Sequence, residues 1–515
     1  MTQGNTVVVD TPYGRLAGEA QDGGVARFLG IPYAKAPVGA LRLRGPRPLE
    51  PWTGTRDART PAPASLQTLG GNQVWMNEPI ARQSEDCLYL NVWTPGIAGR
   101  APVLFWLHGG QTRNGHGAAP GIDGSAFAQR GIVVVTINYR LGGLGGLAHP
   151  DLEDDATGFC ANWSMQDKLA ALDWVGRCIA VFGGDPARVT LAGQSSGGAN
   201  AVMIAQHRLA EGRYSRLIAQ SPPLFRPPMF VDMDAAAEYT EAFAVHVGTN
   251  VTGLRERDGV ELQRAEHAFA YSAELVAKMG RPRTAPVRDG RLLRAWPYDA
   301  GAAAVPALVG WTREEANFWF DMHDGEGKVI SPMKAPQSPE ELAKRLGGLI
   351  GQHYAFPDPP AAADVASAYA DSGSPAAIWR DAYTDLVFRA PVLQFAGAQA
   401  RAGARAWVYE FAHALPSPGR GSPHATDVPL VFGTWRHPHF SCKLAGSPFV
   451  EALSEAMMSA WVAFVIDGNP GSAAGLAWPA FDPRDPTVMR FGPARAEVIP
   501  PERPRGLSCW PRYAA

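Results

Sequence analysis

The chain has 515 residues, 46% of them hydrophobic and 19% charged, so it is long enough and apolar enough to bury a large core. Its formal net charge is only −2 and no stretch is strongly basic, which argues against nucleic acid or an anionic membrane surface as a partner. The longest apolar runs, such as residues 132–137, are far too short to cross a bilayer, so no membrane partner is expected.

The cysteines and the N-terminus bear on compartment and cofactors. The first residues lack the basic segment and long apolar segment of a secretory signal. The cysteines are odd in number, widely spaced and free of any Cys-x-x-Cys pair, so neither a disulfide framework nor a metal site is expected. We therefore predict a cytoplasmic protein with reduced thiols, without metal or cofactor, that is a monomer or a weak homo-oligomer. The five cysteines are Cys87, Cys160, Cys178, Cys442 and Cys509.

The first hundred residues predict short strands separated by turns. Residues 7–10 and 15–19 flank a turn-rich segment and indicate a hairpin. The Pro-rich residues 45–64 are expected to be extended surface chain. A further strand is predicted at residues 88–93, which are closed by Thr94-Pro95-Gly96.

The middle of the chain alternates apolar strands with helical patterns. Residues 102–107 and 132–137 are continuous apolar runs, which are typical of strands covered on both faces in a parallel sheet. Residues 166–182 predict a helix, because apolar residues recur there at spacings of three and four. Further strands are predicted at residues 189–192, 217–220, 305–310 and 406–411, and a closing helix at 452–466.

The domain prediction rests on this alternation of strands and helices. No linker marks a boundary and no internal repeat is visible. We predict a single α/β domain over residues 1–515, with a large, mostly parallel central sheet and helices on both of its faces. Residues 226–300 and 320–400 look mainly helical and are predicted to be insertions.

The segment 189–200 carries the strongest chemical signal. An apolar strand runs into Gly193-Gln194-Ser195-Ser196-Gly197, and small residues that open a helix follow. Strand, G-x-S-x-G and helix is the arrangement of a nucleophile elbow, in which a strained turn lifts the serine hydroxyl above the sheet. The plainer alternative is a Gly/Ser loop, since the chain contains 56 glycines. The flanking strand and helix favour Ser195 as a nucleophile.

A nucleophilic serine needs a base and a group that orients the base. In α/β-hydrolases the acid and then the histidine follow the serine along the chain, at the ends of later strands. The strand at 305–310 is followed by Glu314 and Glu315, and position does not choose between them. His424 lies in a late loop, but it is one of 12 histidines, with His437 and His439 nearby.

An oxyanion hole needs backbone N–H groups directed at the developing negative charge. One is expected from Ser196, directly after the nucleophile. Others are expected from the loop after the strand at 102–107, which begins His108-Gly109-Gly110. The alternative for this loop is an ordinary tight glycine turn.

Several segments together resemble one known family. They occur in family order over nearly the whole chain, and the second of them is highly specific. The chain is similar to the type-B carboxylesterases, the branch of α/β-hydrolases that also contains cholinesterases and bacterial p-nitrobenzyl esterases. The segments are 28–39 (FLGIPYAKAPVG), 85–92 (EDCLYLNV), 138–142 (NYRLG), 182–186 (FGGDP), the elbow, 428–433 (VPLVFG) and 478–479 (WP).

The resemblance implies an α/β-hydrolase fold whose helical insertions form a gorge or cap, and it assigns roles residue by residue. Ser195 matches the nucleophile, Glu315 rather than Glu314 matches the acid, and His424 matches the base. Asp427 matches a carboxylate that supports the loop of His424. The oxyanion donors that it implies are the N–H groups of Gly110, Gln111 and Ser196.

The departures from the family concern the residues around the serine. The family usually has Glu and Ala where this chain has Gln194 and Ser196, and Gln111 stands where Gly or Ala is usual. Thr112 replaces an aromatic residue, and Cys87 lacks the disulfide partner that it has in secreted relatives. The candidates for substrate contact are Thr112, Arg113, Gln194 and Phe318. Arg82, Arg113 and Arg313 are expected near the rim, where they either meet a substrate carboxylate or are simply solvated.

The predicted function is hydrolysis of a small-molecule carboxylic ester through an acyl-enzyme on Ser195. One alternative is a carbamate or amide hydrolase that uses the same three residues. A remote alternative is a non-catalytic binding homologue, which is disfavoured because such homologues have typically lost the serine.

Overall fold

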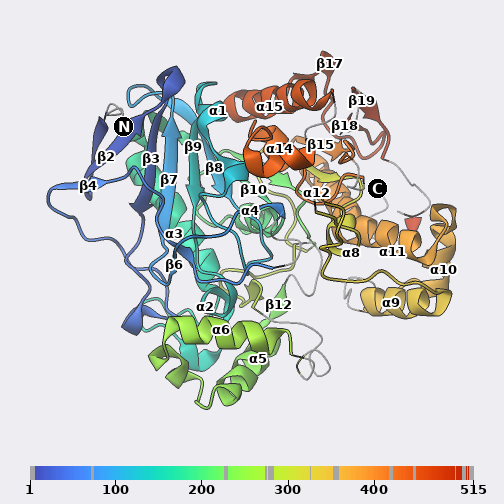
Figure 1. Cartoon of the computed structure of the whole chain (residues 1–515), viewed down its shortest axis with the longest axis horizontal. Coiled ribbons are helices and arrows are strands. Elements are labelled where there is room, and N and C mark those ends of the chain that lie inside the picture. Colours follow the sequence, from blue (N-terminus) through green and yellow to red (C-terminus); the bar gives the residue numbers. More distant parts are fainter. Residues whose placement is uncertain are drawn as a thin grey trace.

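The computed structural model describes most of the chain (Figure 1). The described residues are 6–70, 75–224, 230–272, 275, 284–297, 299–324, 326–351, 359–416, 421–444, 448–492, 495–501, 506 and 508–509.

A 13-stranded sheet forms the centre of the molecule, with the spatial order β1-β2-β3-β7-β9-β8-β10-β11-β14-β15-β18-β19 and β4 paired with β2. Its strands are β1 (Thr6–Thr11), β2 (Gly14–Ala20), β3 (Ala26–Pro32), β4 (Thr55–Asp57), β7 (Tyr89–Thr94), β8 (Ala101–Leu107), β9 (Val133–Ile137), β10 (Gly184–Gln194), β11 (Arg216–Gln220), β14 (Ala307–Thr312), β15 (Ala406–Phe411), β18 (Val488–Phe491) and β19 (Ala496–Ile499).

The middle of this sheet is parallel and its two ends are antiparallel. Strands β9, β8, β10, β11, β14, β15 and β18 pair in parallel, whereas β1 with β2 and β18 with β19 pair antiparallel. The continuous apolar runs account for this, because every residue of β9, β14 and β15 is buried. The predicted hairpin at 7–19 and the predicted parallel strands are confirmed, with bounds that differ by one to five residues.

The major helices pack against the sheet. Helix α4 (Ser196–Gln206) lies on β10 and β11, α12 (Ala390–Arg401) on β14 and β15, and α15 (Val450–Asp467) reaches β8. The predicted helix at 166–182 is α3 (Trp163–Cys178), followed by a 3₁₀ turn at Ile179–Phe182. The closing helix predicted at 452–466 is α15.

Two helical regions lie outside the sheet, at the lower and right-hand edges of Figure 1. The first contains α5 (Met233–His246) and α6 (Gly259–Ala270), which bury Tyr239, Phe243 and Phe269 in a core of their own. The second contains α9 (Pro339–Gly351), α10 (Ala362–Ala368), α11 (Pro375–Thr384) and the π-helix η9 (Asp385–Arg389), which leads into α12. Parts of both predicted insertions, among them 225–229, 276–283 and 352–358, lie outside the described residues.

Strands β18 and β19 were not predicted. Each has four residues, too few for a period to show, so their pairing at the edge of the sheet depends on contacts between distant segments. That the whole chain forms one domain stays a prediction, supported by a sheet that joins strands from both ends of the chain. Within the described residues, no helix has the length and apolarity needed to cross a membrane, and no three His, Cys, Asp or Glu side chains are grouped as metal ligands.

Candidate active site

Ser195 occupies a sharp turn between β10 and α4. Its φ of 55° and ψ of −129° are strained for a residue with a side chain, as the elbow motif predicts. The flanking glycines have no room for side chains: a Cβ on Gly193 would lie 2.5 Å from the carbonyl carbon of Gly197, and one on Gly197 would lie 2.2 Å from the oxygen of Leu107. The strand and helix therefore approach closely enough to expose the turn between them.

The structure brings Glu315 and His424 together, although 109 positions separate them in the chain. His424 Nδ1 lies 2.5 Å from Glu315 Oε2, and the N–H of Thr312 donates to Glu315 Oε1 at 2.8 Å. Both side chains are buried. Glu314 turns elsewhere, because its Oε2 accepts from the N–H of Ser422 at 2.7 Å. Of the two glutamates that follow β14, only Glu315 faces the histidine.

Three aromatic rings surround the imidazole of His424. Their centroids lie 5.6 Å (Phe318), 4.9 Å (Trp319) and 5.1 Å (Phe388) from its own. Phe318 was a candidate from the sequence, but Trp319 and Phe388 were missed. Phe388 belongs to the π-helix η9, and π-turns are frequent at functional sites. No local pattern marks such a turn, so only its packing against His424 shows its place in the site.

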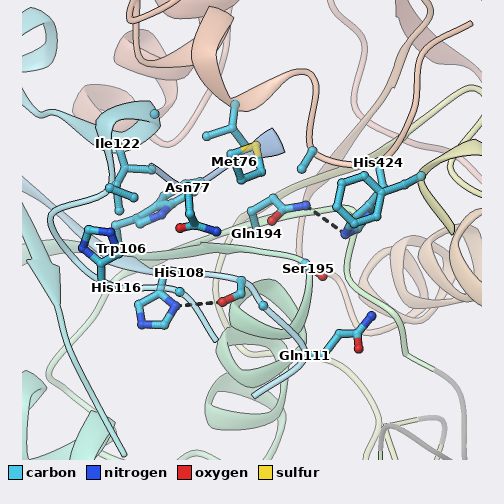
Figure 2. Close-up of a pocket in the computed structure, with 18 of the residues that line it drawn as sticks. Met76, Asn77, Trp106, His108, Gln111, His116, Ile122, Gln194, Ser195 and His424 are labelled. Carbon is cyan, nitrogen blue, oxygen red and sulfur yellow. Dashed lines mark hydrogen bonds between the residues drawn. The ribbon is translucent and has the colours of Figure 1, made fainter. Parts of the chain in front are cut away.

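Gln194 occupies the position next to the other ring nitrogen of His424 (Figure 2). The two Nε2 atoms lie 3.1 Å apart. Within the described part of the chain, no hydrogen bond joins Ser195 Oγ to His424. The three predicted residues are therefore assembled, with a glutamine amide at the imidazole nitrogen that the serine needs.

The loop after β8 presents backbone N–H groups beside Ser195. Gly110, Gln111 and Thr112 all have positive φ, at 108°, 57° and 58°, so two residues with side chains are in left-handed conformations. The N–H of Thr112 donates to Ser196 Oγ at 3.3 Å, which ties this loop to the elbow. Among the described residues, no protein acceptor takes the N–H of Gly110 or Gln111. This arrangement is available for an oxyanion.

Arg113 faces away from the serine and is bound to the first helical region. Its Nη1 and Nη2 lie 2.9 and 2.7 Å from the carboxylate oxygens of Glu266 in α6, and Nη1 also donates to Thr284 Oγ1. The hydroxyl of Tyr239 donates to Glu266 as well. Burial alone would raise the pKa of Glu266, but the Arg113 guanidinium holds it below its ordinary value. Arg113 thus anchors the loop, in contrast to the expectation that it meets a substrate carboxylate.

The other two candidate rim arginines also have protein partners. Arg82 donates to the carbonyl of Pro61, and Arg313 pairs with Glu314 at 3.5 Å. Thr112 lines a second, smaller cavity that includes Thr284 and Asn200.

A stack of three side chains lies beneath the start of the loop. The rings of His108 and Tyr139 are parallel at 4.2 Å, and Lys168 Nζ lies 3.6 Å from the centre of the Tyr139 ring. Burial lowers the pKa of His108 to about 3 and that of Lys168 to about 7. Lys168 Nζ also donates to the hydroxyl and carbonyl of Ser164.

A pocket of about 610 Å³, partly open to solvent, borders Ser195, Gln194 and His424 (Figure 2). Among the described residues, no Asp, Glu, Lys or Arg lines it. Burial lowers the pKa of His116 to about 4, so this histidine is neutral at pH 7, as is His108. Its other lining residues are Met76, Asn77, Trp106, Gly109, Gly110, Gln111, Gly115, Ala119, Gly121, Ile122, Phe318, Trp319, Ala425 and Val428.

Asp427 supports the loop of His424 from behind. It accepts from Tyr409 Oη at 2.8 Å and from Gln220 Nε2 at 2.7 Å. Burial raises the pKa of its carboxyl to about 6, which these hydrogen bonds only partly oppose. Its contacts are with the sheet and not with the pocket.

Comparisons with known proteins agree in sequence and in fold. A family model described as the carboxylesterase family matches residues 5–504. A fumonisin B1 esterase of Sphingopyxis macrogoltabida is 34% identical over 92% of this chain and 84% of its own length. A phenmedipham hydrolase of Pseudarthrobacter oxydans is 32% identical over 95% of this chain and 96% of its own.

Among solved structures, a carboxylesterase of Geobacillus stearothermophilus superposes with a TM-score of 0.82 at 32% identity. The match covers 98% of this chain and 99% of that one. This likeness confirms the predicted α/β-hydrolase fold.

Proposed function

Because this chain belongs to the carboxylesterase family, we propose that it hydrolyses carboxylic esters through an acyl-enzyme formed on Ser195. The observation that carries the proposal is the 2.5 Å contact between His424 and Glu315 beside a strained serine at the end of β10. Glu315 accepts the Nδ1 proton of His424, which leaves the lone pair of His424 on Nε2. That nitrogen is the one available to a serine hydroxyl.

In the first half of the proposed reaction, His424 Nε2 takes the proton of Ser195 as Oγ bonds to the ester carbonyl carbon. The carbonyl oxygen becomes an oxyanion and accepts hydrogen bonds from the N–H groups of Gly110, Gln111 and Ser196. Glu315 stabilises the imidazolium through its hydrogen bond to Nδ1. The tetrahedral intermediate then breaks its bond to the alcohol oxygen, which leaves with the proton from His424.

In the second half, a water molecule replaces the alcohol. His424 removes one proton from the water as its oxygen attacks the acyl carbon, and the same N–H groups stabilise the second oxyanion. The bond to Ser195 Oγ breaks, Oγ recovers its proton from His424, and the carboxylic acid is released. Serine, histidine and glutamate return to their starting states.

The substrate that we propose has an uncharged leaving group. His424 returns its proton to the leaving oxygen, so this oxygen must lie near Nε2 of the histidine and therefore against Gln194. Gln194 borders the pocket that also contains Met76, His116 and Ile122. Since no ionised side chain of the described residues lines this pocket, an ionic group there would lose its hydration without gaining a counter-charge.

The direct test is Ser195→Ala, measured with p-nitrophenyl esters of increasing acyl length. We expect kcat to fall by about 10⁴-fold or more with unchanged thermal unfolding, because the nucleophile is lost and the fold is not. Turnover near the wild-type rate would contradict the proposal. A fluorophosphonate probe should label Ser195 in the wild type, with the modified peptide identified by mass spectrometry.

The carbamate or amide alternative is separated by an aryl carbamate and the ester of the same phenol. We expect the ester to have the higher kcat/KM, and the reverse order would favour the alternative. The cytoplasmic location and the monomeric or weakly associated state stay predictions.

A further inference from the structure

The hydrogen bond between Gln194 and His424 has a defined direction. The carboxylate of Glu315 can only accept, so His424 Nδ1 carries the ring proton and Nε2 carries a lone pair. The amide nitrogen of Gln194 therefore donates to that lone pair across 3.1 Å. This is the same lone pair that must accept the proton of Ser195 in the proposed reaction.

The side chain of Gln194 is held in this direction by its surroundings. Gln194 is the last residue of β10 and is 6% exposed. Its amide oxygen lies over Gly109, where an added Cβ would be 2.6 Å from Oε1. With the oxygen directed at Gly109, the nitrogen is directed at His424, and Figure 2 shows this amide between the pocket and the imidazole.

We propose that Gln194 is a positioning residue: its amide holds Nε2 of His424 in the empty site and transfers to an acceptor in the leaving group of the ester when substrate binds. This inference rests on the proposed function of Ser195 and His424. The transfer frees the imidazole lone pair for the serine hydroxyl at the moment when an ester is present. No covalent bond changes in this step.

The transfer defines a class of preferred substrate. A leaving oxygen that lies near Nε2 of His424 also lies near the amide of Gln194, so atoms just beyond it contact that amide. An ether, carbonyl or hydroxyl oxygen there replaces the acceptor that the amide gives up. A hydrocarbon leaves a buried N–H group without an acceptor, which costs about 1–3 kcal/mol. The preferred esters therefore carry a second oxygen in the alcohol part.

The groups around His424 determine how pH tests this proposal. Glu315 faces Nδ1, and the buried Asp427 lies behind the loop on Tyr409 and Gln220. The pocket histidines, His108 and His116, are kept neutral by burial, and the rings of Phe318, Trp319 and Phe388 carry no charge. Gln194 is thus the neighbour that acts on the Nε2 side, and a donor there stabilises the neutral imidazole.

The first experiment compares pH profiles of kcat/KM for the wild type and Gln194→Met, which keeps the chain length without the amide. Loss of the donor makes protonation of the imidazole easier, so the acid limb should move to higher pH by about half a unit to one unit. The control is Gln399→Met in α12, another buried glutamine, whose amide donates to the carbonyl of Val305 at 2.9 Å. Its profile should not move.

The second experiment uses 2-methoxyethyl acetate and n-butyl acetate, which differ by an ether oxygen in place of one methylene. The ratio of their kcat/KM values should be about 3- to 10-fold larger in the wild type than in Gln194→Met, as expected for one hydrogen bond of about 0.5–1.5 kcal/mol. The intrinsic reactivities of the two esters cancel in this comparison. If Gln194→Met does not fold, as judged by thermal unfolding, Gln194→Ala replaces it.

An acid limb that is the same in the wild type and Gln194→Met, or an ester ratio unchanged by the substitution, would overturn the inference. A limb that moves equally in Gln399→Met would also overturn it, because the effect would then not depend on contact with His424. Failure of the proposed function has a different signature: activity that survives Ser195→Ala. The two failures are therefore distinguishable.

Discussion

The loop after β8 and the loop after β15 flank the same serine but are held in place in different ways. The first, which includes Gly110 and Gln111, presents backbone N–H groups and is anchored at its far side by the buried pair of Arg113 and Glu266. The second presents the side chain of His424, which is held by Glu315 and enclosed by aromatic rings. One loop depends on backbone shape, and the other on contacts of a single side chain.

This difference explains where the chain departs from its family. Where only the N–H group is used, the side chain is free to change as long as φ and ψ are kept, and Gln111 and Thr112 stand in place of the usual residues. The geometry of His424 depends on the atoms of its partners, and the residues on that side keep the family pattern with the exception of Gln194. We therefore expect substitutions to be most costly to turnover on the His424 side and most costly to stability on the Arg113 side.

The largest expected effect is on the His424 side. Glu315→Gln should lower kcat by about 10³- to 10⁴-fold, because an amide neither enforces the Nδ1 proton nor stabilises the imidazolium. Steady-state kinetics with a p-nitrophenyl ester measure this change. The matched control is Glu314→Gln, which can still accept from the N–H of Ser422 and should change kcat by less than about 10-fold. Equal losses in the two variants would contradict the assignment of Glu315.

On the opposite side, Arg113→Ala should mainly cost stability. It leaves the carboxylate of Glu266 buried without its counter-ion, and breaking such a pair costs about 3–5 kcal/mol. Urea unfolding measures the loss, and the double variant Arg113→Met with Glu266→Met should recover most of it. As the loop loosens, kcat/KM should fall equally for neutral and anionic esters. A loss confined to anionic esters would instead show that Arg113 contacts the substrate.

The stack beneath the same loop provides a pH-dependent test. Burial lowers the pKa of Lys168 to about 7 in the folded state, against about 10.4 in an unfolded chain. The unfolded chain therefore binds more protons between these values, and the stability contributed by Lys168 rises as pH rises through this window. Lys168→Met should gain roughly 3 kcal/mol relative to the wild type at pH 7 compared with pH 9.5. A difference in unfolding free energy that does not change with pH would contradict burial of the ammonium group.

The smallest expected effect is that of Gln111→Gly. Glycine relieves the left-handed strain at this position but adds freedom to the unfolded chain, so the unfolding free energy should change by less than about 1 kcal/mol. Turnover should stay within a few-fold of the wild type, since the N–H group remains. A 100-fold loss would show that the Gln111 side chain, and not its backbone, acts on the substrate.

Much of the fold could be predicted because strands and helices have local signatures. Residues 102–107 and 132–137 are apolar without interruption, and such runs form the buried strands β8 and β9. The same logic failed for β18 and β19, which are four residues long and owe their place to pairing with β15 and with each other. The family resemblance and the enzyme class, a carboxylesterase-like hydrolase, are confirmed by the family match over residues 5–504.

The candidate site divides in the same way. The elbow could be located from the sequence because its glycines, strand and helix are contiguous, and the φ of Ser195 agrees with that prediction. Arg113 could not be interpreted, since nothing near it in the chain indicates that Glu266, 153 positions away, would neutralise it. Trp319 and Phe388 were missed for the same reason, as was the contact of Gln194 with His424.

By itself, the sequence determined what is encoded within about a dozen neighbouring residues: the buried strands, the helices and the strained turn at Ser195. Chain order and the family motifs added Glu315 and His424 as candidates. Only the tertiary structure decided which of two glutamates faces the histidine, that Arg113 anchors a loop, and that an amide holds the nitrogen that the serine needs. The physical reason is that hydrogen bonds and ion pairs act over a few ångströms between segments separated by 100 residues or more, and only folding brings those segments together.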